Sequence, residues 1–134
     1  MPRLTLPYRI VAGEPYPVPL CDVYLLGPAG RILVDAVIDS GAVRPIFPRK
    51  AAEDAGIQLP SAPNSRIQYG GGFTDCVLMR VHLLLGELRW DVDVSFAERL
   101  DLPYALLGRR GVFSQFNEVK FLEKSAPARV ELVW

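Results

Sequence analysis

Apolar and polar residues alternate along two neighbouring stretches in the second half of the chain. Over residues 88–96 every second side chain is large and apolar, with Arg, Asp and Ser between them. Residues 77–85 alternate in the same way, and the dipeptide Gly86-Glu87 joins the two stretches. A period of two indicates strands with one buried face, and a two-residue loop with Gly first is typical of a type II′ turn. The pattern predicts a long antiparallel hairpin over residues 73–96.

Shorter apolar runs on either side of this hairpin predict further strands. Residues 21–26 and 31–38 flank the segment Gly-Pro-Ala-Gly at residues 27–30, whose composition is typical of a turn. Residues 119–122 and 130–134 are two shorter apolar runs near the C-terminus. The last run ends on a tryptophan, so it could be buried against a second copy of the chain or complete the chain's own sheet.

One short helix is predicted at residues 48–55. Pro48 suits the first helical turn, where its missing N–H costs nothing. Three alanines give the segment a small apolar face, and Gly56 suits the stop. Residues 58–66 are rich in Pro, Ser and Asn and are interpreted as a loop. The pattern as a whole predicts an all-β, mostly antiparallel fold with one or two short helices.

Length and charge narrow the possible functions. The chain has 134 residues, which fits one domain over residues 1–134 that buries its own core. Half of the residues are apolar, which excludes a disordered tail. Fifteen basic residues balance fifteen acidic ones, without a basic run, so we expect no nucleic-acid partner.

The sequence favours a cytoplasmic location. No apolar stretch approaches the roughly 20 residues of a spanning helix, and the first residues lack the features of an export signal. We therefore expect no membrane association. Cys21 and Cys76 are interpreted as reduced, buried thiols rather than a disulfide. The single histidine, His82, is expected on the surface, and no residue spacing is typical of a metal site.

The candidate chemistry lies in the tripeptide Asp39-Ser40-Gly41, which follows the apolar residues 34–38. Asp, a hydroxyl residue and Gly can hold a carboxylate in a tight turn at the end of a strand. Two such carboxylates side by side share a proton and can activate a water for attack on a peptide carbonyl. On its own the tripeptide also fits an ordinary β-turn.

Three further segments follow this tripeptide in order. Ile-Phe-Pro at residues 46–48 leads into the short helix, a Gly-rich segment occupies residues 69–73, and Ala-Leu-Leu-Gly-Arg at residues 105–109 follows the long hairpin. From about residue 15 to residue 122, this order and spacing resemble the retropepsin-like aspartic peptidases, the single-lobed family related to retroviral proteases. The resemblance implies the acid protease fold, a closed barrel or half-barrel with one lobe per chain.

The resemblance also implies a role for each segment. The catalytic residue would be Asp39, in a turn supported by Ser40, Gly41 and Ala42. The flap and substrate-binding residues would be Tyr69, Gly70, Gly71, Gly72 and Phe73. The strand that threads behind the catalytic turn would contain Leu106, Leu107, Gly108 and Arg109.

The Gly-rich segment has other readings. It fits a mobile lid that excludes water from a site, or a flexible loop without function. A phosphate-binding loop fits poorly, because no Lys-Ser/Thr follows and the next element is a strand. Tyr69 and Phe73 could contact a substrate or could equally be core aromatics.

The resemblance implies a homodimer. The chain contains a single Asp-Ser-Gly, and it is too short for two lobes, so Asp39 would meet its copy across a two-fold axis. Ser40 would hydrogen-bond across that axis. One Asp39 would act as general base on water and the other as general acid, on a peptide or protein substrate bound as an extended strand. This chemistry needs no metal or cofactor.

Two residues depart from the family pattern. Viral relatives pair the arginine equivalent to Arg109 with an aspartate just after the catalytic Ala, where this chain has Val43 followed by Arg44. Arg109 could instead pair with Asp101 or Glu98, or face solvent. Arg44 could pair with the catalytic aspartate and spoil the shared proton. The alternatives to a peptidase are therefore a non-catalytic peptide-binding or dimerisation module, and a monomeric β-domain.

Overall fold

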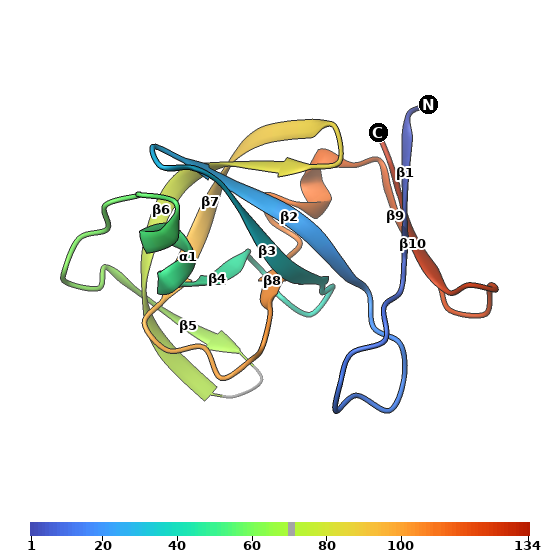
Figure 1. Cartoon of the computed structure of the whole chain (residues 1–134), viewed down its shortest axis with the longest axis horizontal. Helices are drawn as coiled ribbons and strands as arrows, with labels where there is room; N and C mark the ends of the chain where they lie inside the picture. Colours follow the sequence, from blue (N-terminus) through green and yellow to red (C-terminus); the bar gives the residue numbers. More distant parts are fainter. Residues whose placement is uncertain (70–71) are drawn as a thin grey trace.

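The computed structural model describes residues 1–69 and 72–134. Within these residues, strands dominate and the helices are short, which confirms the predicted all-β fold (Figure 1). The strands are β1 (Arg3–Pro7), β2 (Leu20–Gly27), β3 (Gly30–Ile38), β4 (Ile46–Pro48), β5 (Ser65–Tyr69), β6 (Gly72–Leu85), β7 (Leu88–Ala97), β8 (Ala105–Leu107), β9 (Glu118–Leu122) and β10 (Arg129–Val133). The helices are α1 (Arg49–Asp54) and the 3-10 helix η1 (Phe113–Gln115).

The larger sheet closes on itself. Its strand order is β2-β3-β8-β4-β7-β6-β5, and β2 also pairs with β6, so that β2, β3, β8, β4, β7 and β6 form a barrel in the described part of the chain. Most neighbours are antiparallel, while β3–β8 and β4–β7 are parallel. Large side chains fill the interior, among them Leu25, Phe47, Leu83 and Phe96, all fully buried. Closure removes most free sheet edges and leaves β5 attached to β6 at the rim.

The predicted long hairpin is confirmed. Strands β6 and β7 pair from Cys76↔Ala97 to Leu85↔Leu88, which leaves a two-residue loop. Gly86 is the first residue of this loop and has φ +59°, as the first central position of a type II′ turn requires. The alternating apolar side chains of β7 face the core. The predicted hairpin at residues 21–38 is also present, with Gly27 paired to Gly30.

The short helix is present but starts later than predicted. Pro48 lies in β4 and caps α1 with an extended backbone, φ −67° and ψ 144°, because the strand paired with β7 runs up to this residue. At the other end Gly56 has φ +74°. Its N–H donates to the Glu53 carbonyl oxygen over 3.0 Å, and the Ile57 N–H donates to that of Ala52 over 2.9 Å. This is a Schellman motif, so Gly56 ends the helix as expected.

The chain termini meet in a second, smaller sheet. Strand β10 lies between β1 and β9, with Arg3 opposite Val133, and both termini lie on the same side of the molecule (Figure 1). Val130 and Leu132 are buried against the barrel core. The C-terminal run therefore completes the chain's own sheet, which is one of its two predicted roles.

The predicted loop at residues 58–66 differs from the structure, whereas the prediction for the two cysteines agrees with it. The predicted loop at residues 58–66 ends early, because Ser65 and Arg66 already pair with β6 as part of β5. Cys21 and Cys76 are both buried and free, as predicted. Burial raises the pKa of the Cys21 thiol to about 12.

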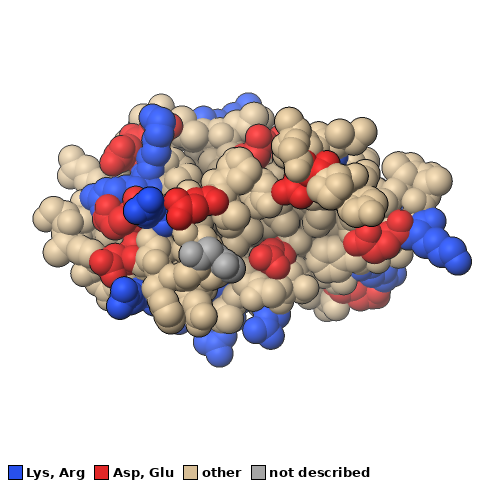
Figure 2. All heavy atoms as spheres, turned by 90° about the horizontal axis from the view of Figure 1, so that it is seen from below, with Lys and Arg blue, Asp and Glu red and all other residues tan. Residues whose placement is uncertain are grey.

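The surface carries mixed charge. On the face drawn in Figure 2, acidic and basic side chains are interspersed and uncharged atoms cover most of the area. Within the described residues, none of the helices has both the length and the apolar character needed to cross a bilayer.

Candidate active site

Asp39 lies where β3 ends, in a tight turn held by backbone hydrogen bonds. Its N–H donates to the carbonyl oxygen of Leu107 over 3.0 Å, and its carbonyl oxygen accepts from the N–H of Ala42 over 3.2 Å. Its carboxylate oxygen Oδ1 accepts from the N–H of Gly41 over 2.8 Å. These bonds hold a half-buried carboxylate in one direction, which a group that must meet a reacting atom requires.

Strand β8 lies directly behind this turn. Its Leu106 pairs with Val37 of β3 in parallel register and with Ile46 of β4 in antiparallel register. The two strands that flank the turn are therefore fixed to the same three-residue strand. The predicted segment at residues 105–109 thus lies next to the predicted aspartate turn.

Gly108 follows β8 at the closest contact of the site. A Cβ atom at this position would lie 2.7 Å from the carbonyl oxygens of both Ala42 and Arg44. The next residue, Arg109, donates its N–H to the Ala42 carbonyl oxygen over 2.9 Å. Only glycine lets the two backbones approach this closely, so Gly108 seats the turn on the strand behind it.

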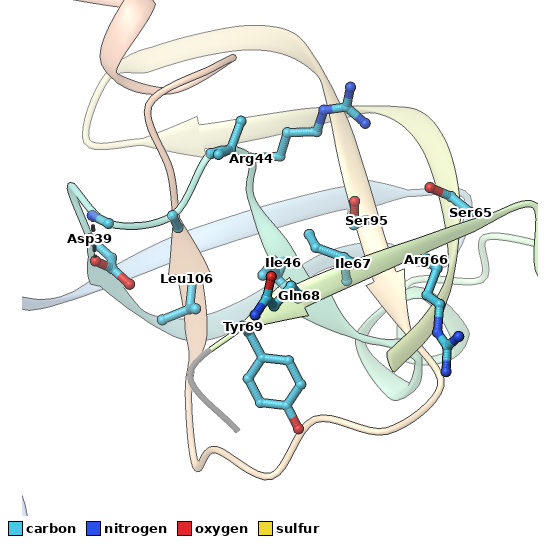
Figure 3. A pocket seen from close by; sticks show the side chains of 13 residues that line it. Asp39, Arg44, Ile46, Ser65, Arg66, Ile67, Gln68, Tyr69, Ser95 and Leu106 are labelled. Atoms are coloured by element: carbon cyan, nitrogen blue, oxygen red, sulfur yellow. Dashed lines mark hydrogen bonds between the residues drawn. The ribbon is translucent and has the colours of Figure 1, made fainter. Parts of the chain in front are cut away.

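A cleft of about 630 Å³ opens in front of the turn. Asp39 lies at one side of it and Arg44 extends along its upper rim, as Figure 3 shows. In the same view, apolar side chains lie between Asp39 and the two serines at the other end of the cleft. These lining residues are Ile46, Ile67, Leu106, Ser65 and Ser95. The cleft therefore has an oriented carboxylate at one side, an apolar floor, and the polar side chains of Arg44 and the two serines at its other end.

The aromatic residues on either side of the Gly-rich segment have different surroundings. Tyr69 lines the cleft, and its hydroxyl is 3.5 Å from Oδ2 of Asp101. Phe73 is 64% exposed, and the Arg66 guanidinium lies 5.5 Å from its ring centroid. Phe73 is therefore not a core aromatic. Gly72 has φ +119°, whereas the predicted flap residues Gly70 and Gly71 lie outside the described residues.

Arg44 does not pair with Asp39. No ion pair joins these two side chains among the residues with a described position, and Figure 3 shows Arg44 extending away from Asp39. The pairing that could spoil the shared proton is therefore not found within this chain. The neighbouring Val43 is 49% exposed, and Ser40 is exposed as well.

The partner of Arg109 was left open by the sequence. The two carboxylates that could have paired with Arg109 have other partners. Oε1 of Glu98 lies 2.6 Å from Nη1 of Arg49, and Oδ1 of Asp101 lies 3.5 Å from Nε of Arg99. Arg109 itself is exposed. Of the possibilities, a solvent-facing side chain is the one found.

Several cleft residues were not foreseen from the sequence. Besides the predicted Tyr69, the other four residues of β5 line the cleft, and so does Ser95 of β7, which is only 1% exposed. The alternation of β7 assigned Ser95 to a polar outer face, whereas the end of this strand is buried on both faces. The signal that is available is the apolar pair Phe96-Ala97, which ends the alternation and indicates a strand end enclosed by other elements.

His82 is exposed, as predicted, and lies on the barrel surface against Asp91. Within residues 1–69 and 72–134, no three His, Cys, Asp or Glu side chains come together in a way that could hold a metal ion.

Comparison with known proteins identifies the fold. No family model matches the sequence, and no curated protein matches it. The structure is similar to the crystal structure of a retropepsin-like aspartic protease from Rickettsia conorii, with a TM-score of 0.67 and 12% identity over 97% of this chain and 98% of that one. It is also similar to EIAV protease complexed with the inhibitor HBY-793, with a TM-score of 0.55 and 15% identity over 75% of this chain and 88% of that one. The chain therefore has the retropepsin-like fold, and the fold expected from the sequence resemblance is confirmed.

Proposed function

We propose that the protein is a homodimeric aspartic endopeptidase, in which two Asp39 carboxylates, one from each subunit, activate a water molecule. The observation that carries this proposal is the Asp39 turn itself. A half-buried carboxylate is held by the Gly41 N–H over 2.8 Å at the side of a large cleft. The fold shared with aspartic proteases supports the same reading.

The need for a second copy follows from the residues beside Asp39. One chain supplies one Asp-Ser-Gly turn, and a single carboxylate cannot act as general base and general acid at the same moment. Ser40 and Gly41 are exposed next to it, and Val43 exposes half of an apolar side chain. A two-fold related copy would cover this surface and bring the second carboxylate against the first.

The proposed reaction proceeds without a covalent enzyme adduct. One Asp39, ionised, takes a proton from water while the water oxygen bonds to the peptide carbonyl carbon. The other Asp39, protonated, gives its proton to the carbonyl oxygen, which forms a tetrahedral hydrate. The hydrate then collapses: a carboxyl proton moves to the amide nitrogen, a hydroxyl proton of the hydrate passes to the other, ionised carboxylate, and the C–N bond breaks to give the acid and the amine. Two close carboxylates that share one proton suit this exchange at about pH 4–6.

Strand β5 supports a peptide substrate in extended form. It is the last strand of its sheet, and among the described residues it pairs only with β6. All of its residues, 65–69, line the cleft. A free strand edge along a cleft can hydrogen-bond an extended peptide through its backbone, so substrate would lie between β5 and the Asp39 turn.

The test is cleavage of a mixed peptide library near pH 5, read by mass spectrometry, with Asp39→Asn as the paired variant. Asp and Asn have nearly the same shape, so circular dichroism should show the same fold for both proteins. Cuts made by the wild type alone are expected. Equal cutting by Asp39→Asn would remove Asp39 from the mechanism. A lack of cutting by protein shown to be dimeric would favour the non-catalytic peptide-binding module instead.

A further inference from the structure

The end of the cleft opposite Asp39 carries an arginine and a buried serine hydroxyl. We propose that Arg44 and Ser95 form a subsite for an acidic side chain, so that the protein selects peptides with Asp or Glu at a defined distance from the cut. This inference rests on the proposed function, because it names the substrate class of the same cleft.

The local geometry brings these two residues to one wall. Arg44 lies in the bend just before β4, two residues before Ile46, and both residues line the cleft. Ser95 pairs with Ile46 in parallel register. The Ser95 N–H donates to the Pro45 carbonyl oxygen over 3.0 Å, which fixes β7 beside the residue that follows Arg44.

The Arg44 charge is available to a ligand. Arg44 is half-buried, and its guanidinium forms no ion pair within the described residues. The two carboxylates that line the adjoining surface hollow together with Arg44 already have partners. Oδ1 of Asp93 lies 3.3 Å from Nη1 of Arg80, and the carboxylate of Asp91 contacts the His82 ring. A cation at the rim of a low-dielectric cleft attracts a substrate anion more strongly than an exposed one does.

Ser95 provides an independent observation. The residue is 1% exposed and is one of the residues that line the cleft, so it forms part of the cleft wall. In Figure 3 its hydroxyl points toward the side of the cleft along which Arg44 extends. A substrate carboxylate would accept hydrogen bonds from Arg44 and Ser95 together, whereas an amide side chain would bring no charge to the guanidinium.

The proposed two-fold symmetry sharpens this inference. Each subunit would supply its own Arg44, so one copy would lie on each side of the scissile bond. Acidic residues should therefore be enriched both before and after the cut. The apolar residues Ile46, Ile67 and Leu106 between Arg44 and Asp39 should favour apolar side chains at the positions nearer the cut.

The first experiment compares cleavage profiles of one peptide library for the wild type, Arg44→Gln and Arg110→Gln. Arg110 is a matched control, because it is exposed, does not line the cleft and borders the same surface hollow as Arg44. The wild type and Arg110→Gln should enrich Asp and Glu at the same positions, and Arg44→Gln should not. For a matched Glu and Gln peptide pair, kcat/KM should differ about tenfold or more in the wild type. Arg44→Lys should restore part of that ratio.

The second experiment measures binding without cleavage. Asp39→Asn is titrated with fluorescent peptide pools that carry Glu or Gln at matched positions, at low and high salt. Tighter binding of the Glu pool, weakened by salt and lost in Asp39→Asn combined with Arg44→Gln, is expected. Equal binding of both pools overturns the subsite even if the wild type cleaves peptides. If the Glu pool binds more tightly but the wild type cleaves no peptide, the acidic subsite is supported and the proposed peptidase activity is overturned. Acidic enrichment that survives Arg44→Gln would overturn the assignment to Arg44.

Discussion

Gly108 and Ala42 approach so closely that a methyl group on the Gly108 Cα would stand 2.7 Å from the Ala42 carbonyl oxygen. The same methyl group would meet the Arg44 carbonyl oxygen at 2.7 Å. We predict that Gly108→Ala destabilises the protein by about 2 kcal/mol or more, because both obstacles are backbone atoms that cannot rotate away. Urea unfolding measures the loss. Cleavage should fall further than stability alone explains, because the displaced backbone carries the Asp39 turn.

The control for this prediction is Gly13→Ala. Gly13 has φ +86°, and a Cβ there would have nothing within 4 Å. This substitution should cost only the backbone strain of an alanine at positive φ, about 1 kcal/mol, and should leave cleavage unchanged. If Gly108→Ala were as stable and as active as Gly13→Ala, the turn would not depend on its contact with Gly108.

The parts of the fold that are visible in the sequence are those held together by local contacts. The β6–β7 hairpin has both of its signals within one segment: strict alternation and a glycine that can adopt φ +59°. The stop of α1 at Gly56 is equally local. Strands β4 and β8 have three residues each, too few for a period. They become strands because barrel closure places them between partners that are distant in sequence.

The candidate site also has a part that the sequence predicts and a part that it does not. The Asp39 turn and the segment behind it are adjacent in space because strand order brings β3 and β8 together, and the resemblance in motif order anticipated this. The polar far end was not anticipated. Ser95 lies on a strand whose alternation looks solvent-facing, and its burial depends on the parallel pairing of β4 with β7. Tertiary enclosure of this kind leaves little trace in the local pattern.

The two thiols provide a simple test of the barrel interior. Cys21 and Cys76 are 1% and 0% exposed, and burial raises the pKa of the Cys21 thiol. Because the thiolate is the reactive form, neither thiol should react with a thiol reagent at pH 8 in the native protein. Both should react after unfolding in guanidinium chloride, so that two thiols are titrated per chain. Rapid labelling of either thiol in the native state would contradict the packing of β2 or β6.

The ion pair between Arg9 and Asp22 predicts a dependence of stability on pH. Arg9 Nη1 lies 2.7 Å from Asp22 Oδ1 and 3.9 Å from Asp35 Oδ1. The hydrogen bond from Arg9 lowers the pKa of Asp22 below its ordinary value of 3.8. A lowered folded pKa stabilises the protein above pH 3.8, and this contribution is lost as the pH falls through the lower, folded value.

We therefore expect Asp22→Asn to be less stable than the wild type at pH 6. The difference should stay below about 1 kcal/mol, because both side chains of the pair are more than 40% exposed and solvent screens them. Urea unfolding at several pH values should show the two proteins converging as the pH approaches 2.5. Glu87→Gln, at the exposed hairpin turn, serves as the control. A gap between Asp22→Asn and the wild type that widens on acidification would be contrary to the pKa shift.

The proposed shared site can be tested by mixing subunits. Wild-type protein and Asp39→Asn are unfolded together in equal amounts and refolded, so that subunits pair at random. If each site needs two Asp39 carboxylates, only about one quarter of the dimers carry a complete pair, and activity per wild-type chain should fall to about half. A self-sufficient subunit would keep its full activity per chain. Arg110→Gln, mixed in the same way, controls for losses in refolding. Sedimentation checks that both mixtures are dimeric, since a fully active monomer would remove the two-fold site altogether.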